Sequence, residues 1–170
     1  MAQEIERKFL VVGEYKLFAH NSMRIIQGYI ATGLRTVRVR IGDNRAWLTI
    51  KGPSHDGGVS RYEWERQIDM EGARELMKLA VGAVIDKRRY YVEYEGHTFE
   101  VDEFYGENEG LTIAEVELQS ADEEFARPAW LGKEVTGDKR YYNARLREHP
   151  YREWNDEYNP QQYREMIVMW

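Results

Sequence analysis

Four pairs of acidic residues, each split by one apolar residue, stand out in the first 120 positions of this 170-residue chain. They are Glu4 and Glu6, Glu63 and Glu65, Glu100 and Asp102, and Glu115 and Glu117. Crowded carboxylates repel one another and need cations nearby. Their hard oxygen atoms are the ligands that Mg²⁺ and Mn²⁺ prefer in proteins. The pairs therefore point to divalent-metal chemistry.

A second set of positions carries the opposite charge. Bases stand singly or at the same two-residue spacing, at Lys8, Arg38, Arg40, Lys51, Lys87 and Arg89. Guanidinium and ammonium groups match the oxygens of phosphate. A divalent ion that bridges carboxylates to phosphates would satisfy both sets at once. The two sets together predict a site for a metal–triphosphate complex.

The two-residue spacing is the side-chain period of a β-strand. Between turn sequences such as "GDN", "HDGG" and "YEGH", strands are predicted over 3–11, 24–31, 35–41, 45–51, 60–68, 87–95, 97–104 and 111–119. In 35–41, for example, Val37 and Val39 alternate with Arg38 and Arg40. Each strand therefore gathers its charges on one face.

Taken one at a time, these strands fit a sheet whose charged face lies in water. The charges, however, sort by strand into acidic and basic rows, which a solvated face does not require. Eight antiparallel strands can close into a barrel that lines its interior with alternate residues. Six bases in such an interior need a compensating anion. We therefore predict an α+β protein, an eight-stranded antiparallel β-barrel with a polar lumen and flanking helices.

Helical spacing and capping signals predict helices over 71–83, 122–131, 137–148 and 160–170. The first places Leu76 and Leu79 on one face, and the last starts at Asn159 followed by Pro160. We expect residues 1–148 to form one domain. Residues 149–170 would be a C-terminal extension that packs on it as a helix.

Composition excludes several classes of function. The formal net charge of −6 argues against nonspecific binding to nucleic acid or to anionic membrane. The absence of cysteine rules out disulfides, thiolate metal sites and cysteine nucleophiles. No apolar run approaches the roughly 20 residues of a membrane span, and no signal-peptide pattern is seen. A cytoplasmic protein is expected.

The ordered motifs resemble the CYTH superfamily, also called triphosphate tunnel metalloenzymes. "EIERK" at residues 4–8 is similar to the ExExK signature of that family. "TVRVR", "LTIKG", "YEWE", "KRRY", "VDEFYGENEGLTIAEVEL" and "VTGDKRYYNARL" follow in the order typical of its short bacterial members. The resemblance runs from residue 3 to about 148. It implies a tunnel-shaped barrel with a C-terminal plug helix at one mouth, in enzymes that hydrolyse or rearrange triphosphates.

The resemblance also implies roles for individual residues. The metal ligands would be Glu4, Glu6, Glu63, Glu65, Asp102, Glu115 and Glu117, and the phosphates would be held by Lys8, Arg38, Arg40, Lys51, Lys87 and Arg89. A Tyr–Lys pair that helps to activate water in hydrolytic relatives matches Tyr29 and Lys51. A phenol acts as a base near neutral pH only if a nearby cation stabilises its phenolate.

The expected activity is hydrolysis of inorganic triphosphate to pyrophosphate and phosphate, with two Mg²⁺ or Mn²⁺ ions as cofactors. A class IV adenylate cyclase and a thiamine or nucleoside triphosphatase are the alternatives within the family. A noncatalytic polyphosphate-binding module is disfavoured, because a pure anion binder gains nothing from paired carboxylates. The expected partner is a small-molecule triphosphate, neither nucleic acid nor membrane, and the choice between monomer and homodimer is left open.

Overall fold

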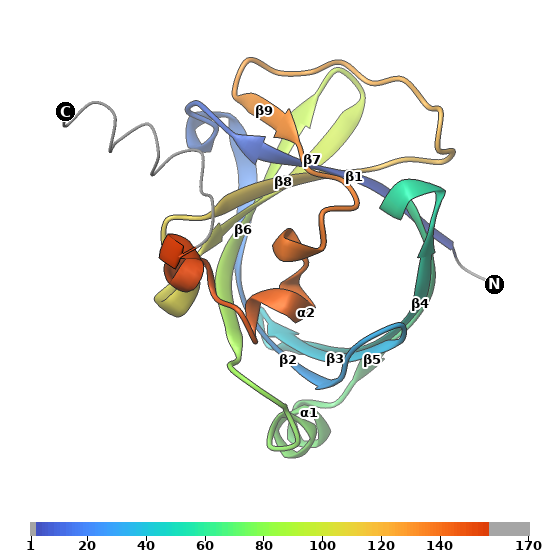
Figure 1. Cartoon of the computed structure of the whole chain (residues 1–170), viewed down its shortest axis with the longest axis vertical. Helices are drawn as coiled ribbons and strands as arrows, with labels where there is room; N and C mark the ends of the chain where they lie inside the picture. The colour runs from blue at the N-terminus through green and yellow to red at the C-terminus, as the bar shows by residue number, and fades with distance from the viewer. Residues whose placement is uncertain (1–2, 157–170) are drawn as a thin grey trace.

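Strands make up half of residues 3–156, the part of the chain that the computed structural model describes (Figure 1). They are β1 (Gln3–Val11), β2 (Ala19–Ala31), β3 (Thr36–Gly42), β4 (Arg45–His55), β5 (Ser60–Ile68), β6 (Ile85–Tyr94), β7 (His97–Phe104), β8 (Thr112–Glu117) and β9 (Leu131–Glu134). Eight of them form an antiparallel sheet in the order β5-β4-β3-β2-β6-β7-β8-β1, and a β5–β1 pairing closes it. The predicted barrel is confirmed.

Tight turns join neighbouring strands of the barrel as the sequence predicts. Asp43 and Asn44 have φ values of 48° and 61° between β3 and β4. Glu95 and Gly96, between β6 and β7, have φ values of 45° and 84°. Two successive positive φ values are typical of the type I′ turn, whose twist matches that of the flanking strands. These turns help to fix the register, and with it the side chains that point inward.

Much of the apolar packing lies on the outer face of the barrel. Phe9, Phe99 and Val116 are fully buried beneath the segment that leads into β9, where Trp130 covers them. On the far side, α1 (Met70–Met77) sets Ala73 against Val39 and Ala46. Because the strands pack outward on these elements, their inward positions are available for charge.

Helix α1 is shorter than the predicted 71–83. It begins after Asp69, whose side chain accepts a hydrogen bond from the backbone N–H of Gly72. It ends at Met77, so Leu79 lies beyond it and is 58% exposed. The helix packs closely on the barrel at Gly28, where a Cβ atom would lie 2.7 Å from Met77 Sδ. A side chain at position 28 would push the helix away.

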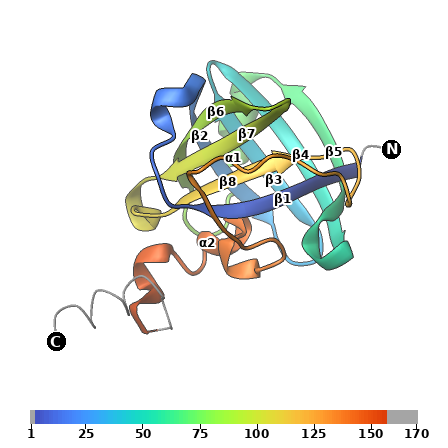
Figure 2. The same cartoon turned by 90° about the horizontal axis from the view of Figure 1, so that it is seen from above.

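The segment after β9 crosses one mouth of the barrel (Figures 1 and 2). We call residues 137–156 the plug. It contains the 3₁₀ turns η4 (Lys139–Tyr141) and η5 (Tyr151–Asp156) and the four-residue helix α2 (Asn143–Leu146). The predicted continuous helix over 137–148 is wrong, because Gly137 has a φ of 80° and Tyr142 is extended. Apolar barrel residues pack against the plug: Leu10, Ile85, Phe104, Leu111 and Ile113.

The predicted helix over 122–131 is also wrong. This stretch runs as turns and extended chain across the outside of the barrel, and β9 then pairs with β1. Pro128 disfavours helical geometry at the residue before it. Phe125 and Trp130 pack on Phe99 with ring centroids 6.1 and 5.5 Å apart. Outward aromatic packing therefore determines the path of this segment.

The remaining elements are short 3₁₀ turns at η1 (Lys16–Phe18), η2 (Asp56–Gly58) and η3 (Gly106–Asn108). Residues 149–156 belong to the plug, while the predicted helix 160–170 lies outside the described residues. No helix within residues 3–156 is long and apolar enough to cross a membrane.

Arg7 links residues 122–134, which we call the covering segment, to the barrel. It points away from the lumen, and its Nε donates to Glu134 Oε2 of β9 at 2.8 Å. Its second nitrogen, NH2, contacts Glu134 Oε1. The guanidinium also lies 5.3 Å from the ring centroid of Phe125. Two parallel hydrogen bonds and a ring contact make this pair more than an ordinary surface ion pair.

Replacing Arg7 by Ala is expected to lower the free energy of unfolding by about 1–2 kcal/mol, because it removes the paired hydrogen bonds and the ring contact. Urea unfolding followed by circular dichroism measures the change.

Lys78→Ala is the matched control. Lys78 pairs with Glu75 at 3.0 Å, but both side chains are about 70% exposed. Loss of such a pair should change the free energy of unfolding by less than about 0.5 kcal/mol. If the two substitutions have equal effects, the link through Arg7 does not stabilise the barrel.

Candidate functional site

All eight barrel strands contribute to a single polar cavity of about 240 Å³ inside the barrel. Every base predicted to hold phosphate lines it: Lys8, Arg38, Arg40, Lys51, Lys87 and Arg89. So do the predicted metal ligands Glu4, Glu6, Glu63, Glu65, Glu115 and Glu117, and the predicted catalytic residue Tyr29. The inward alternation of charges therefore brings nearly all the predicted site residues to one place.

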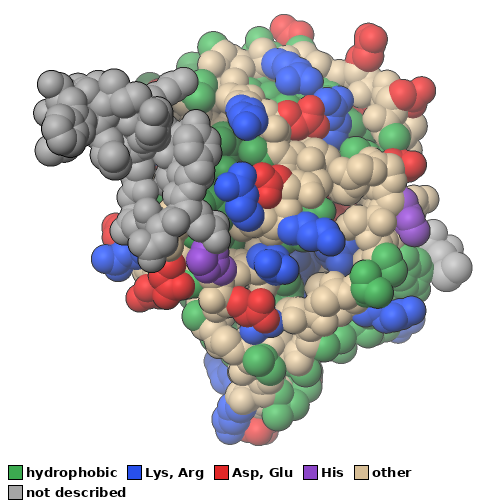
Figure 3. Space-filling model, in the orientation of Figure 1, with side chains coloured by type: hydrophobic (Ala, Val, Ile, Leu, Met, Phe, Trp, Pro, Cys, Tyr) green, Lys and Arg blue, Asp and Glu red, His purple; other side chains and the backbone are tan. Residues whose placement is uncertain are grey.

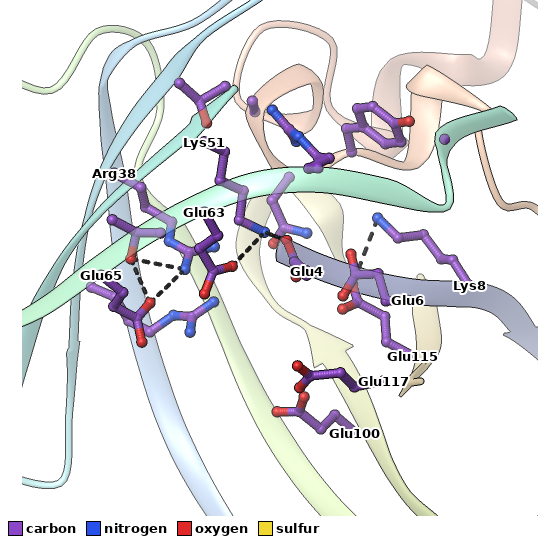
Figure 4. Close-up of a pocket in the computed structure, with 18 of the residues that line it drawn as sticks. Glu4, Glu6, Lys8, Arg38, Lys51, Glu63, Glu65, Glu100, Glu115 and Glu117 are labelled. Carbon is purple, nitrogen blue, oxygen red and sulfur yellow. Dashed lines mark hydrogen bonds and ion pairs between the residues drawn. The ribbon is translucent and has the colours of Figure 1, made fainter. Parts of the chain in front are cut away.

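Lys51 lies between two acidic side chains where strands β1, β4 and β5 meet (Figure 4). Its Nζ is 2.6 Å from Glu4 Oε2 and 3.6 Å from Glu63 Oε2. Lys51 and Glu63 are direct partners in the β4–β5 ladder. Burial raises the pKa of Glu63 to about 7, and the nearby Glu4 adds to this effect. Burial opposes ionisation of Glu4 too, but the charge of Lys51, together with hydrogen bonds to Glu6, Lys51 and Glu63, lowers the pKa of Glu4.

Lys8 faces Glu115 across the β1–β8 ladder, with Nζ 3.6 Å from Oε1. Burial disfavours the charged form of both groups, but each stabilises the other. The pKa of Glu115 is therefore lowered and that of Lys8 is raised. The ring of Tyr142, in the plug, lies 4.9 Å from Lys8 Nζ, which places this ion pair close to the plug.

Other acidic side chains face one another directly. Glu6 is opposite Glu117 in the β1–β8 ladder, and Glu100 is opposite Glu115 in the β7–β8 ladder. Burial raises the pKa of Glu6 well above its usual value, helped by Glu115 and Glu4. Burial also raises the pKa of Glu117, with Glu4 and Glu100 adding to it. Like charges at directly paired positions destabilise a sheet, so the nearby bases do not fully offset the burial of these carboxyls and the repulsion between them.

The opposite wall is dominated by bases around one carboxylate. Asp102 Oδ2 accepts from Lys87 Nζ at 2.7 Å, and its Oδ1 accepts from Arg89 Nε at 2.8 Å. The contact with Arg89 is bidentate, since NH2 also reaches Oδ2 at 2.9 Å. Burial lowers the pKa of Lys87 to about 7 despite Asp102, and Arg89 and Arg40 add to the fall.

This placement gives Asp102 a different surrounding from that of the other predicted metal ligands. It is 2% exposed, and it lies behind the two bases instead of lining the cavity. Burial opposes its ionisation, yet Arg89 and Lys87 lower the pKa of Asp102. Both oxygens are occupied by these bases, so the geometry favours a counter-ion that holds Lys87 and Arg89 in position. Its role as a metal ligand stays a prediction.

Arg38 and Arg40 extend this basic wall along β3. Arg38 NH2 lies 3.2 Å from Thr49 Oγ1 and 3.5 Å from Glu65 Oε2. Arg40 Nε donates to Gln27 Oε1 at 3.1 Å. Burial, with the charges of Arg38 and Arg89 close by, lowers the pKa of Arg40 to about 10. The bases thus crowd one another as the acids do, and an anion between them would relieve the repulsion.

Tyr29 and Lys51 both line the cavity, but each has other partners in this structure. The Tyr29 hydroxyl lies 3.4 Å from Gln27 Nε2, a long hydrogen bond, while Lys51 contacts Glu4 and Glu63. The proposed cooperation of Tyr29 with Lys51 stays a prediction.

Glu100, a member of the predicted acidic pairs, also lines the cavity. Several other polar residues line or support the cavity without having been predicted. They are Gln27, Thr36, Thr49, Arg61, Thr136, Tyr142 and Asn143. Gln27 and Arg61 could have been predicted. Each lies two residues from a predicted site residue on the same strand and therefore points into the lumen as well. Thr136 and Asn143 carry no such signal, since they follow the last barrel strand in a segment without a regular period.

The outer surface reflects this distribution of charge. In Figure 3, which looks onto the mouth that the plug crosses, Lys and Arg side chains gather around the middle of the face, with a few Asp and Glu side chains among them. Although the net charge is −6, the approach to this mouth is therefore locally basic. Such a field attracts anions.

Known proteins share this architecture. A family model described as the CYTH domain matches residues 2–143. The chain is 45% identical over 159 residues to an inorganic triphosphatase of Acetivibrio thermocellus, with 92% of this chain and 100% of the relative covered. It is 37% identical over 152 residues to an inorganic triphosphatase of Nitrosomonas europaea, with 84% and 95% covered.

Among solved structures, that of the inorganic triphosphatase NE1496 aligns with a TM-score of 0.62 at 35% identity. The alignment covers 86% of this chain and 95% of that protein. Enzymes of the matched family generally depend on divalent metal ions. With a family model that spans most of its length, and with a closed barrel whose charged lumen matches the predicted motifs, this chain belongs to the CYTH family.

Proposed function

We propose that this protein hydrolyses inorganic triphosphate to pyrophosphate and phosphate with the help of Mg²⁺ or Mn²⁺. The observation that carries the proposal is the division of one closed cavity into an acidic wall and a basic wall. A compact chain of phosphates with bound divalent cations complements both walls. Two relatives named inorganic triphosphatases, each more than 35% identical over most of the chain, support the same substrate.

The size of the cavity favours a small polyanion. Its volume of about 240 Å³ is below the roughly 300–1,000 Å³ of pockets that enclose drug-sized ligands. A nucleotide would have to leave its base and sugar outside the barrel. Inorganic triphosphate needs only contacts to phosphate oxygens, which the basic side chains can supply. The small cavity therefore favours inorganic triphosphate over ATP and thiamine triphosphate.

The residues of the acidic wall fit a hard divalent cation. Glu6 and Glu117 face each other in direct ladder pairing, and both carboxyls have raised pKa values. Carboxylate oxygens are suitable ligands for Mg²⁺ and Mn²⁺. Within the described part of the chain, no three acidic or histidine side chains already converge as a formed metal site. Glu4 instead contacts Lys51, and Glu115 contacts Lys8.

We therefore assign metal binding to Glu4, Glu6, Glu63, Glu65, Glu115 and Glu117. A bound triphosphate would draw the bases away from these carboxylates and free their oxygens for the metal. The bound ion would neutralise phosphate oxygens and provide an activated water. The bases would hold the chain of phosphates in line and offset the charge that develops on the leaving pyrophosphate. Tyr29, with Lys51, remains our candidate for receiving the proton of the attacking water.

Incubation with tripolyphosphate and Mg²⁺ or Mn²⁺ should release phosphate, and EDTA should stop the release, because a bound cation is needed to activate the attacking water. Phosphate release is measured colorimetrically, with ATP and thiamine triphosphate in parallel. A clear preference for ATP or thiamine triphosphate would overturn the assignment of the substrate. Formation of cyclic AMP and pyrophosphate from ATP, separated by chromatography, would identify a cyclase instead.

Replacing Glu6 by Gln should lower kcat/KM for tripolyphosphate about 100-fold or more, because it removes an anionic metal ligand from the centre of the acidic wall. Glu124→Gln is the control, since Glu124 is exposed on the covering segment and should leave turnover unchanged. Thermal unfolding of both variants verifies the fold. Full activity of the Glu6 variant would remove it from the proposed metal site.

The stability of the metal-free protein should fall as the pH rises from about 5 to about 7. Glu6 and Glu63 have raised pKa values, so the folded protein retains protons that the unfolded chain has already released. Stability from a raised pKa is complete at low pH and is lost as the pH rises through the folded-state value.

Thermal unfolding in EDTA at several pH values measures this trend. Glu6→Gln should flatten the dependence, whereas Glu124→Gln should leave it as in the wild type. A wild-type stability that rises with pH over this window would contradict the repulsion inferred between the carboxylates.

A further inference from the structure

A continuous chain of buried polar contacts links the plug to the basic wall. Asn143, the first residue of α2, accepts a hydrogen bond at Oδ1 from Lys87 Nζ at 2.9 Å. The same oxygen accepts from Gln27 Nε2, also at 2.9 Å. Gln27 is fully buried, and its Oε1 accepts from Arg40 Nε at 3.1 Å. One side-chain oxygen of the plug thus reaches two of the six bases.

The donors in this chain determine the orientation of both amides. Arginine and lysine only donate hydrogen bonds, so the Gln27 atom that faces Arg40 must be the oxygen. Its nitrogen then faces Asn143, and the Asn143 atom that meets both Gln27 and Lys87 must also be an oxygen. Each amide therefore has one compatible orientation, and the hydrogen-bonded side chains form a single network.

We propose that Asn143 is a positioning residue, whose side-chain oxygen holds Lys87 directly and Arg40 through Gln27 in the geometry that binds the phosphate nearest the plug. The role rests on the proposed function, since it requires that these bases hold a phosphate chain. Asp102 holds Lys87 from behind, at 2.7 Å, and Asn143 holds it from the plug side. Together they restrict the ammonium group to one position.

The plug has other anchors, so loss of the Asn143 side chain should leave it in place. Leu146 is fully buried, and Tyr141 and Trp154 stack edge to face with centroids 5.2 Å apart. Arg147 NH1 donates to the carbonyl oxygen of Val81 at 2.7 Å. These contacts lie outside the polar chain, which makes Asn143 a site where positioning can be altered with little change in folding.

The test compares Asn143→Ala with wild type in two measurements. One is the kinetics of tripolyphosphate hydrolysis with Mg²⁺, and the other is calorimetric binding of tripolyphosphate in EDTA, where turnover is not needed. We expect KM and Kd each to rise about tenfold, the effect of one lost hydrogen bond to a charged group. We expect kcat to change by less than about threefold, because the same groups still act once substrate is bound.

A purely structural role would give a different pattern. A smaller folded fraction lowers the apparent kcat and leaves KM and Kd unchanged, and that result would overturn the proposal. Unchanged values of all three constants would overturn it as well. Arg145→Ala is the matched control, because Arg145 is exposed on the same helix and should leave KM and Kd as in the wild type.

Gln27→Met provides a second variant. It should raise Kd by a similar factor, and combining it with Asn143→Ala should raise Kd by less than the product of the two effects, since both substitutions remove the same support of Arg40. Fully multiplicative effects on Kd would contradict the hydrogen-bonded link from Asn143 through Gln27. If wild type binds tripolyphosphate but does not hydrolyse it, the proposed function fails while the Kd comparison still decides the role of Asn143. If wild type does not bind it, both fail.

Discussion

Charge confined inside a closed barrel is the constraint on which the rest of this structure depends. Eight strands direct acids and bases into one cavity, where burial penalises every ion that lacks a partner. Ion pairs such as Lys8 with Glu115 and Lys51 with Glu4 offset part of the penalty. Directly paired acids such as Glu6 and Glu117 add to it. The free protein therefore retains an electrostatic cost that a metal–triphosphate complex would relieve.

That constraint also explains where the apolar core lies. Since most of the lumen is given to charge, the strands must bury their apolar side chains against segments outside the barrel. The segment around Phe125 and Trp130 covers one side, and α1 covers another. At the plugged mouth, inward apolar residues such as Phe104 and Ile113 meet the plug. The covering segments are thus required for stability, and the plug serves both packing and the positioning of the basic wall.

The strands, the barrel and most of the site could be predicted because strand alternation and charge are both visible in the sequence. Asp102 lies two residues from Glu100 and points to the same side of the strand. Strand alternation alone therefore could not reveal that Asp102 lies behind Lys87 and Arg89. The helices after β8 could not be located, because Pro128, Gly137 and aromatic packing override helical spacing there. Asn143 acts through its place at the mouth of the tunnel, which depends on tertiary packing alone.

A crystal structure of the protein soaked with tripolyphosphate and Mn²⁺, with anomalous diffraction to locate the metal, tests the division of the cavity most directly. We expect the phosphates to lie between the two walls, in contact with bases including Arg38, Arg40 and Lys87. We expect Mn²⁺ between the phosphates and the carboxylates of Glu4 and Glu6. Phosphates bound outside the barrel, or Mn²⁺ away from the acidic wall, would contradict the charge-balance explanation of this fold.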